Sequence, residues 1–204
     1  MNSNVLALAV LPNGDLVAGG NFTTAGGVPA SCIARWNGSA WSSLGSGMNF
    51  SVLALAVLPN GDLVAGGSFT TAGGVAANRI ARWNGSTWSA LGSGMNSSVL
   101  ALAVLPNGDL VAGGGFTTAG GVAANGIARW NGSAWSSLGS GANGVSALAV
   151  LPNGDLVAGG GFTTAGGVPA SCIARWNGSA WSSLGSGMNF SVLALAVLPN
   201  GDLV

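Results

Sequence analysis

The feature that most constrains this chain is a repeat of about 47 residues. The decapeptide LPNGDLVAGG begins at Leu11, Leu58, Leu105 and Leu151, and a truncated copy begins at Leu198. The repeat units therefore cover residues 1–47, 48–94, 95–141 and 142–187, followed by a partial unit at 188–204. Residues 161–204 match residues 21–64 at every position but one, which indicates recent amplification or deliberate design. We expect one repeat domain over residues 1–204.

Each repeat has the pattern of four short β-strands and shows no convincing helical period. In the first repeat we expect strands at 5–11, 15–20, 32–36 and 40–45. The first of these, VLALAVL, has no polar face, as a strand buried on both sides requires. Four antiparallel strands per unit predict an all-β protein, a β-propeller with four full blades and a partial fifth. A solenoid is the alternative, but parallel β-helix coils are usually shorter and lack two hairpin turns per unit.

Two turn sequences punctuate each repeat. In the PNG turn, Pro12 and Asn13 suit the middle of a type I turn, and Gly14 suits the left-handed position of a bulge. The WNGS turn leaves two registers open. A turn centred on Gly38 and the serine after it places the two tryptophans of the repeat opposite each other, whereas a turn centred on Asn37 and Gly38 does not.

The two tryptophans of each repeat have two interpretations. Eight tryptophans in a chain otherwise poor in large side chains are expected to pack within and between blades. An indole face also suits the C–H side of a sugar, and partial exposure of one ring of each pair is the route by which a ligand would be contacted.

The Gly-Gly strand ends and the spaced tryptophans together resemble the kelch motif. In the first repeat these residues are Gly19-Gly20, Trp36 and Trp41, and the other repeats have the same set: Gly66-Gly67 with Trp83 and Trp88, Gly113-Gly114 with Trp130 and Trp135, and Gly159-Gly160 with Trp176 and Trp181. The first aromatic is Trp where kelch repeats usually have Tyr, and the aromatics are only five residues apart. The sequence is also similar to repetitive propeller arrays of secreted and cell-surface bacterial proteins. The resemblance implies a binding or scaffolding role, an extracellular or bacterial-surface location, and no catalytic residues.

The residue types that are missing argue against an enzyme. The only charged side chains are five Asp and five Arg, and the chain has no Lys, Glu, His or Tyr. Most general acids and bases, Schiff-base nucleophiles and imidazole metal ligands are therefore unavailable, as are the ligands of a galactose-oxidase type of copper site. We predict no catalytic residues, no cofactor and no metal. A net charge of zero gives no footprint for nucleic acid, and the longest apolar run, Val5 to Leu11, is too short for a membrane span.

The glycine pairs do not form a phosphate-binding loop. Such a loop needs a Lys or a following helix, and this chain offers neither. We interpret Gly19-Gly20 as a place where blades approach closely and Gly26-Gly27 as residues with positive φ in a loop.

The remaining reactive residues are also interpreted as structural. Asp15 and Arg35 recur once per repeat, which suggests a regular structural partner for each. A ring of such Asp residues could bind Ca²⁺, but one carboxylate per blade and no D-x-D-x-D-G spacing argue against it. Cys32 and Cys172 occupy equivalent places in two different repeats, so we expect free thiols rather than a disulfide.

The places where the repeats differ supply the candidate binding face. Differences concentrate in the loop between the second and third strands and in the connection between repeats, which emerge on the same face of an up-and-down blade. The candidate residues are Asn21, Ser31, Cys32, Ser68, Asn78, Arg79, Asn125 and Ser171. A binding surface and neutral drift in exposed loops predict this pattern equally well.

The sequence thus favours a non-enzymatic propeller module for binding or scaffolding. We expect a homo-oligomer, because an open ring exposes blade faces and strand edges that favour pairing, or a piece of a longer array. A further alternative is that residues 188–204 compete with residues 1–17 for the same place in the fold. A protein or carbohydrate ligand is expected, with no nucleic-acid or membrane partner. The alternatives are a designed or recently amplified repeat without a specific ligand, and a lectin-like propeller.

Overall fold

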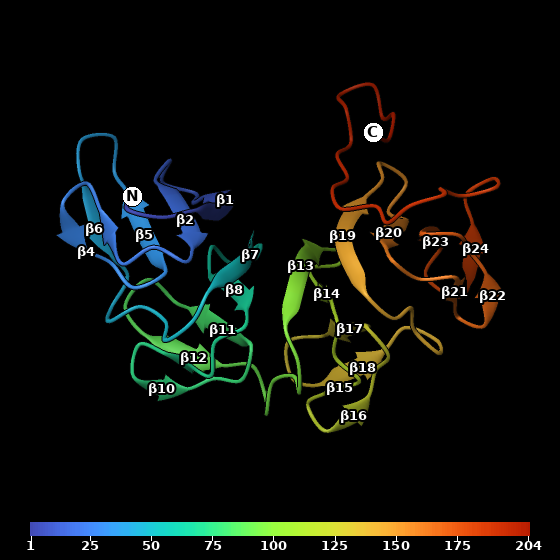
Figure 1. Ribbon diagram of the computed structural model, residues 1–204, viewed down its shortest axis with the longest axis horizontal. Coiled ribbons are helices and arrows are strands. Elements are labelled where there is room, and N and C mark those ends of the chain that lie inside the picture. Colours follow the sequence, from blue (N-terminus) through green and yellow to red (C-terminus); the bar gives the residue numbers. More distant parts are fainter. The chain divides into compact units, whose positions relative to one another are not determined.

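The computed structural model describes all 204 residues and is built from β-strands without any helix. It therefore has no helix that could cross a membrane. Every repeat forms one four-stranded antiparallel sheet and one two-stranded hairpin (Figure 1). We number the four-stranded sheets blade 1 to blade 4 in chain order. This architecture confirms the predicted all-β fold of four-stranded antiparallel blades.

The blades share one strand order, in which each strand of the sheet pairs with the next one along the chain. Blade 1 contains β1 (Val5–Val10), β2 (Leu16–Gly20), β5 (Ile33–Trp36) and β6 (Trp41–Ser43). Blade 2 contains β7 (Val52–Val57), β8 (Leu63–Gly67), β11 (Ile80–Trp83) and β12 (Trp88–Ala90). Blade 3 contains β13 (Val99–Val104), β14 (Leu110–Gly114), β17 (Ile127–Trp130) and β18 (Trp135–Ser137). Blade 4 contains β19 (Val145–Val150), β20 (Leu156–Gly160), β23 (Ile173–Trp176) and β24 (Trp181–Ser183).

The hairpins lie in the loop between the second and third strands of each blade, where no strand was expected. They are β3 (Thr24–Ala25) with β4 (Val28–Pro29), β9 (Thr71–Ala72) with β10 (Val75–Ala76), β15 (Thr118–Ala119) with β16 (Val122–Ala123), and β21 (Thr164–Ala165) with β22 (Val168–Pro169). Gly26 and Gly27 form the first of these turns and have φ angles of +55° and +83°. Their predicted positive φ is confirmed, and it serves a hairpin rather than an irregular loop.

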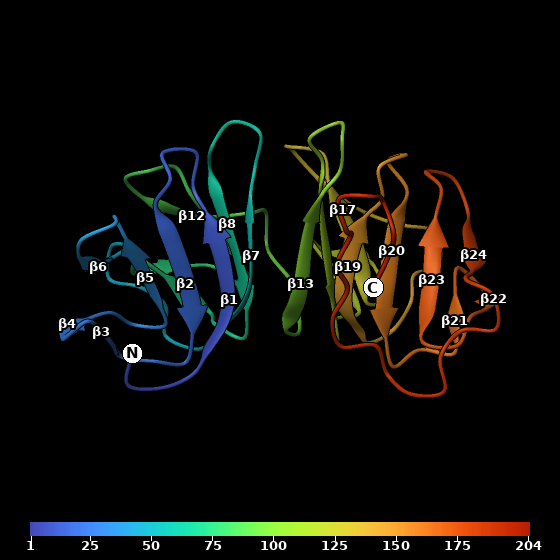
Figure 2. The same ribbon diagram turned by 90° about the horizontal axis from the view of Figure 1, so that it is seen from above.

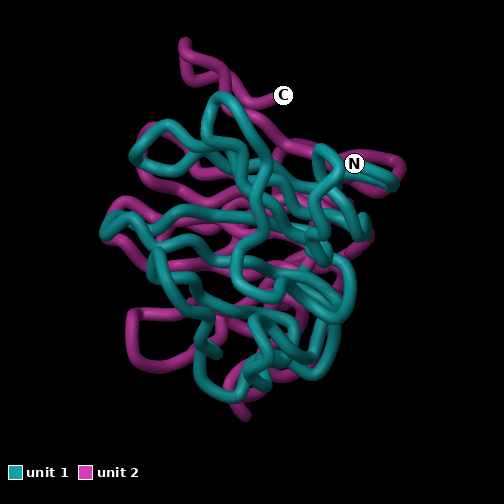
Figure 3. The backbone as a smooth tube through the Cα atoms, turned by 90° about the vertical axis from the view of Figure 1, so that its left-hand side faces the viewer, with its two compact units in different colours: residues 1–99 teal, residues 100–204 magenta.

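The chain divides into two compact units, Met1–Val99 and Leu100–Val204, which Figure 3 shows in separate colours. The first unit holds blades 1 and 2. The second unit holds blades 3 and 4 together with the partial repeat at 188–204. Only Val99, the first residue of β13, lies in the first unit. The expectation of one repeat domain over residues 1–204 stays a prediction.

The turn between β1 and β2 has the predicted bulged form. The Gly14 amide donates to the Leu11 carbonyl at 2.9 Å, and Gly14 has a φ of +87°. The Leu11 amide donates to the carbonyl of Asp15 at 2.8 Å, which closes the ladder beyond the turn. The Asn13 side chain accepts from the Asp15 amide at 3.2 Å, so the turn also satisfies this backbone donor.

The turn between β5 and β6 decides the register that the sequence leaves open. Trp36 pairs directly with Trp41, so Gly38 and Ser39 form the centre of the turn. The Asn37 side-chain oxygen accepts from the backbone amides of Ser39 at 3.0 Å and Ala40 at 2.9 Å. The asparagine therefore supplies the acceptor that the tight turn needs, and its side chain fixes the two tryptophans opposite each other.

Within the first unit the hydrophobic core lies between the two blades. Val17 and Ile33 of blade 1 are fully buried in one cluster with Val52 and Leu63 of blade 2. The glycine at the end of β2 makes this approach possible, because a Cβ at Gly19 would lie 2.5 Å from Cγ1 of Val52. The predicted role of Gly19 in close blade packing is therefore confirmed.

The second unit repeats this interface between blades 3 and 4. Val111 and Ile127 share a buried cluster with Val145 and Leu156. A Cβ at Gly113 would lie 2.5 Å from Cγ1 of Val145, the same distance as in the first unit. The interface between consecutive blades is thus a repeated element in its own right.

A tryptophan hydrogen bond joins the blades within each unit. The indole N–H of Trp88 donates to the Leu44 carbonyl at 3.0 Å, and that of Trp181 donates to the Leu138 carbonyl at 2.9 Å. Both indole rings are only 5% exposed. The second tryptophan of these repeats is therefore a packing residue with a satisfied donor, as the structural interpretation predicts.

Candidate functional site

An Asp–Arg ion pair lies in every blade beside the first turn. The Nε of Arg35 lies 3.5 Å from the Asp15 carboxylate, and the other blades have the same pair at 3.6, 3.6 and 3.1 Å. The carboxylate also accepts from the amide nitrogen of Asn13 at 2.9 Å. The sequence suggests a regular structural partner for this Asp and for this Arg, and in each blade the two residues are partners of one another.

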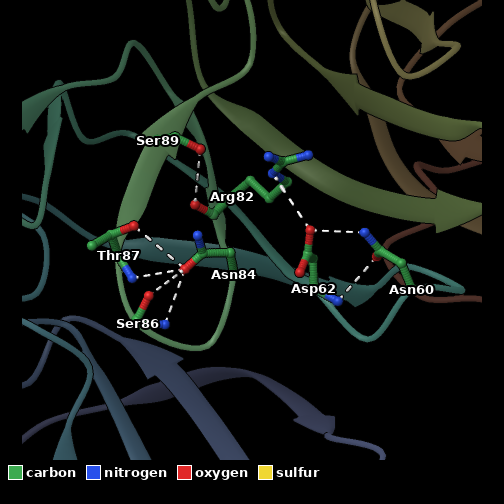
Figure 4. A network of polar contacts seen from close by, with 7 residues as sticks. All are labelled: Asn60, Asp62, Arg82, Asn84, Ser86, Thr87 and Ser89. Atoms are coloured by element: carbon green, nitrogen blue, oxygen red, sulfur yellow. Dashed lines mark hydrogen bonds and ion pairs between the residues drawn. The ribbon is translucent and has the colours of Figure 1, made fainter.

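The arginine of each pair keeps hydrogen-bonding capacity after pairing. Figure 4 shows Arg82 of blade 2 contacting Asp62 through Nε, while its two terminal nitrogens point away from the carboxylate. The Arg82 side chain is 44% exposed, whereas that of Asp62 is 15% exposed. The terminal N–H groups of this guanidinium are therefore available as a donor pair for a carboxylate or carbonyl.

Two of these arginines, Arg35 and Arg129, line a cleft between the two blades of their unit, and the equivalent cleft occurs in both units. In the second unit its volume is about 450 Å³. Its lining residues are Leu105, Pro106, Asn107, Arg129, Asn153, Gly154, Asp155, Trp176, Asn177 and Gly178. In the first unit the equivalent cleft has a volume of about 220 Å³ and is lined by Leu11, Pro12, Asn13, Arg35, Gly61, Trp83 and Gly85.

The first tryptophan of each pair contributes to the cleft, and the second supports it from the core. Trp176 is half-buried and lines the cleft, and its ring centroid lies 5.5 Å from that of the buried Trp181. Trp83 and Trp88 have the same relation in the first unit, at 5.3 Å. Each cleft therefore combines an indole, an ion-paired guanidinium and, in the larger case, several side-chain amides. This arrangement suits binding through hydrogen bonds and an aromatic surface.

The clefts contain few ionisable side chains. No three His, Cys, Asp or Glu side chains in the chain come together in a group that could hold a metal ion. The ionisable side chains of the larger cleft are Arg129 and Asp155, each of which belongs to an ion pair.

The residues expected from sequence lie at the opposite end of the blades. Figure 2 shows β3 and β4 of the first unit at the end away from the β1–β2 turn. Asn21 is exposed there and accepts from the Ser3 hydroxyl at 3.0 Å, and the carbonyl of the exposed Ser31 accepts from the Met48 amide at 3.0 Å. The loop and the inter-repeat connection therefore meet on one face within this unit, as expected.

Several of the expected residues support the loop with backbone or side-chain contacts. The Arg79 guanidinium donates to the carbonyl of Ser68 at 2.6 Å and to that of Phe69 at 3.3 Å, so it folds back onto its own loop. The exposed Asn78 donates to the Ser93 carbonyl at 3.1 Å. In the second unit the carbonyl of the exposed Asn125 accepts from the Ala142 amide at 2.8 Å. The carbonyl of the exposed Ser171 accepts from the Met188 amide at 2.9 Å.

The most variable position of this loop has an unusual backbone. Cys32, Arg79 and Cys172 have φ angles of +63°, +67° and +63°, and blade 3 has Gly126 there with +72°. Glycine is the residue that adopts this conformation without strain, so three of the four repeats have a strained residue. Both cysteines are free thiols, as expected. Burial raises the pKa of the Cys32 thiol above its ordinary value.

The sequence reasoning missed the clefts because it looked for differences between repeats. Every residue that lines the clefts belongs to the invariant LPNGD and RWNG segments. The signal that could have found them is the once-per-repeat Arg beside a Trp, taken together with the packing of one blade on the next.

The four-stranded blades and their repeated interfaces define a β-propeller repeat protein. Residues 1–140 match the family described as the Rax2 C-terminal beta propeller domain, and the chain belongs to that family. No curated protein matches the chain in sequence. The resemblance to kelch repeats in particular stays a prediction.

Solved propellers resemble the chain in fold at low sequence identity. The WD40 beta propeller domain of Doa1 is 17% identical with a TM-score of 0.58, over 98% of this chain and 60% of that one. A virginiamycin B lyase from Staphylococcus aureus, crystallised with quinupristin, is 15% identical with a TM-score of 0.61, over 99% of this chain and 62% of that one. YCF48 bound to a D1 peptide is 16% identical with a TM-score of 0.61, over 99% and 60%. The chain thus spans about 60% of the length of these propellers, and the likeness shows their fold.

Proposed function

We propose that the chain is a non-enzymatic binding module that holds protein partners through the clefts between its blades. The observation that carries this proposal is the cleft between blades 3 and 4, which Arg129 and Trp176 both line. Its terminal N–H groups suit the main-chain carbonyls or a carboxylate of an extended peptide. The kelch-like Gly-Gly and Trp pattern fits this role, since the resemblance implies binding rather than catalysis.

The charge of the clefts indicates the kind of recognition. Each cleft arginine is paired with a carboxylate, and the chain has no net charge. Long-range attraction of an anionic partner is therefore weak, and contacts within hydrogen-bonding distance decide specificity.

A carbohydrate ligand is the second candidate. It is favoured by the half-buried Trp176, which lies in the same cleft as the side-chain amides of Asn107, Asn153 and Asn177. An indole with several amides suits the apolar face and the hydroxyl groups of a sugar ring. The near identity of the repeats supports a third possibility, a propeller amplified without any specific ligand.

Peptide and glycan arrays probed with the full chain separate these candidates. We expect a peptide set to bind, and Arg129→Gln to weaken binding by about 10-fold or more, since hydrogen bonds to a charged group are lost. Asn78→Ala, at the other end of the blades, is the matched control and should bind normally. The reverse pattern assigns binding to the loop face, a glycan-only response supports the carbohydrate candidate, and no binding on either array contradicts both.

A further inference from the structure

One side of blade 1 is exposed although its counterparts in other blades are buried. Val5 is 41% exposed, whereas Val52 of blade 2 and Val145 of blade 4 are fully buried. Leu8 and Val10 follow on the same strand at 60% and 63% exposure. We call the surface formed by Val5, Leu8, Val10 and Trp41 the open face of blade 1. It is the surface that blades 2 and 4 bury against the preceding blade of their own unit.

The open face also carries unused hydrogen-bond donors. The indole N–H of Trp41 has no acceptor, whereas the equivalent donors of Trp88 and Trp181 bind the carbonyls of Leu44 and Leu138. The amide of Gly26 likewise has no partner, whereas Gly73 of blade 2 donates to the Gly47 carbonyl at 2.7 Å. The open face therefore presents the two donors, an indole N–H and a glycine amide, that join neighbouring blades elsewhere in the chain.

Residues 188–204, called the C-terminal segment below, lie on blade 4 as an inner strand of a next blade would. A Cβ at Gly159 would lie 2.5 Å from Cγ1 of Val192, which repeats the relation between Gly19 and Val52. At the other end of the strand, a Cβ at Gly201 would lie 3.4 Å from Cγ of Pro152. The segment has the sequence of residues 48–64 and differs from residues 1–17 at only two positions.

The C-terminal segment covers only part of this side of blade 4. Leu44 and Leu138 are each 2% exposed, and their carbonyls accept an indole N–H from the next blade. The equivalent residue of blade 4, Leu184, is only half-buried, and its carbonyl receives no indole donor. A Cβ at Gly185 would have no atom within 4 Å, whereas one at Gly45 would lie 3.5 Å from the ring of Trp88. Blade 4 therefore has an acceptor, the Leu184 carbonyl, that is not used by an indole N–H.

We propose that blade 1 of a second copy of this chain displaces the C-terminal segment from blade 4. Val5 and Leu8 of the second copy then pack on Gly159, where Val192 and Leu195 lie in the single chain. The indole of Trp41 donates to the Leu184 carbonyl. The amide of Gly26 donates to the carbonyl of Gly187, as that of Gly73 does to Gly47.

The occupant is a second copy because a segment of nearly the same sequence already lies on this surface. Blade 1 presents that strand together with the Trp and Gly-Gly loop that the C-terminal segment does not supply. The contact joins different surfaces of the two copies, so it is head-to-tail and produces a closed ring or a growing chain of copies. It uses blade faces rather than the clefts, and so stands or fails independently of the proposed ligand.

Sedimentation velocity of the full chain over a range of concentrations tests this assembly. We expect multiples of the 19.6 kDa chain that increase with concentration. Leu8→Asp should weaken association by about tenfold or more, because a carboxylate would be buried against Gly159 without a partner. Val75→Asp is the matched control, since Val75 is 47% exposed on β10 and lies outside the open face, and it should assemble like the unmodified chain.

A second pair of variants tests the competing role of the C-terminal segment. Leu195→Asp should release the segment from Gly159 and increase the assembled fraction, whereas Leu193→Asp should not, because Leu193 is 75% exposed. A single-chain mass for both the unmodified chain and Leu195→Asp at every concentration would overturn the proposal. Assembly that persists unchanged in Leu8→Asp would overturn it as well.

Discussion

Blade 1 and blade 4 are nearly the same sequence in different surroundings. Residues 21–47 and 161–187 differ at one position, and both blades have the same four strands. Yet Trp181 is buried and donates to a carbonyl of blade 3, whereas Trp41 is half-buried and its indole nitrogen has no partner. The burial of a side chain here depends on the neighbouring blade as much as on the repeat to which the side chain belongs.

The comparison indicates where the stability of this chain resides. A blade folds its own hairpins with local turns and buries Phe22, or its equivalent, in a cluster that in blade 1 needs no neighbour. The other large apolar residues of the core are buried where two blades pack together. Stability in such a chain is approximately a sum of repeat terms and nearest-neighbour terms. Matched substitutions at equivalent positions therefore measure the neighbour's contribution directly.

The largest difference is expected between the two tryptophans. Trp181→Ala should lower the free energy of unfolding by about 3–5 kcal/mol, because it removes a buried ring from a packed interface. Trp41→Ala should cost clearly less, since its ring is half-exposed and its indole makes no hydrogen bond. Urea unfolding followed by circular dichroism measures both. Equal losses would contradict the view that the adjacent blade determines the contribution of this residue.

An intermediate difference is expected between two glycines at the ends of second strands. Gly113→Ala should destabilise by about 1–3 kcal/mol, because the new methyl group meets Val145 of an intact blade. Gly159→Ala meets Val192 of the C-terminal segment at the same distance, but that segment makes no four-stranded sheet and can shift. Thermal unfolding of the two variants should rank them in this order. A larger loss for Gly159→Ala would show that the C-terminal segment is held as firmly as a blade.

The smallest effect is expected at the cysteine of blade 1. Cys32 packs beside the core shared by blades 1 and 2, and burial raises the pKa of its thiol. Because the thiolate is the reactive form, its alkylation by iodoacetamide should rise at a higher pH than that of an unburied thiol. The rate is measured against pH in a Cys172→Ser background, with the same variant in urea as the control. An identical profile in urea would mean that blade 2 does not affect this thiol.

The sequence predicts the local features of the fold well, since each depends on residues close together in the chain. The repeat length follows from the sequence period, and the four strands follow from the alternation of side chains within each repeat. The PNG turn follows from the ease with which glycine adopts a positive φ, as Gly14 does. The hairpin of β3 and β4 was missed because two-residue strands leave almost no periodic signal. The register of the two tryptophans stayed open because the sequence WNGS is compatible with a turn at either of two positions. The hydrogen bonds accepted by the side chain of Asn37 decide between them.

The candidate site was harder to predict because it is made by two blades. Arg129 and Trp176 are 47 residues apart and meet only when blade 4 packs on blade 3. The variable loop drew attention to Arg79, but its guanidinium is used by the carbonyls of its own loop. Variation between repeats identifies positions that tolerate change, and a strained backbone at Cys32 and Arg79 is one reason that no single residue is strongly preferred there.

The identity of residues 48–64 and 188–204 has a consequence for how the chain folds. Two segments of one sequence compete for every partner that either can pair with, so local energy alone gives no unique strand order. Val52 pairs with Gly67, only fifteen positions further along, and the entropy of closing such a short loop favours this partner over a distant copy. During folding it is therefore distance along the chain, rather than residue type, that tells the two copies apart.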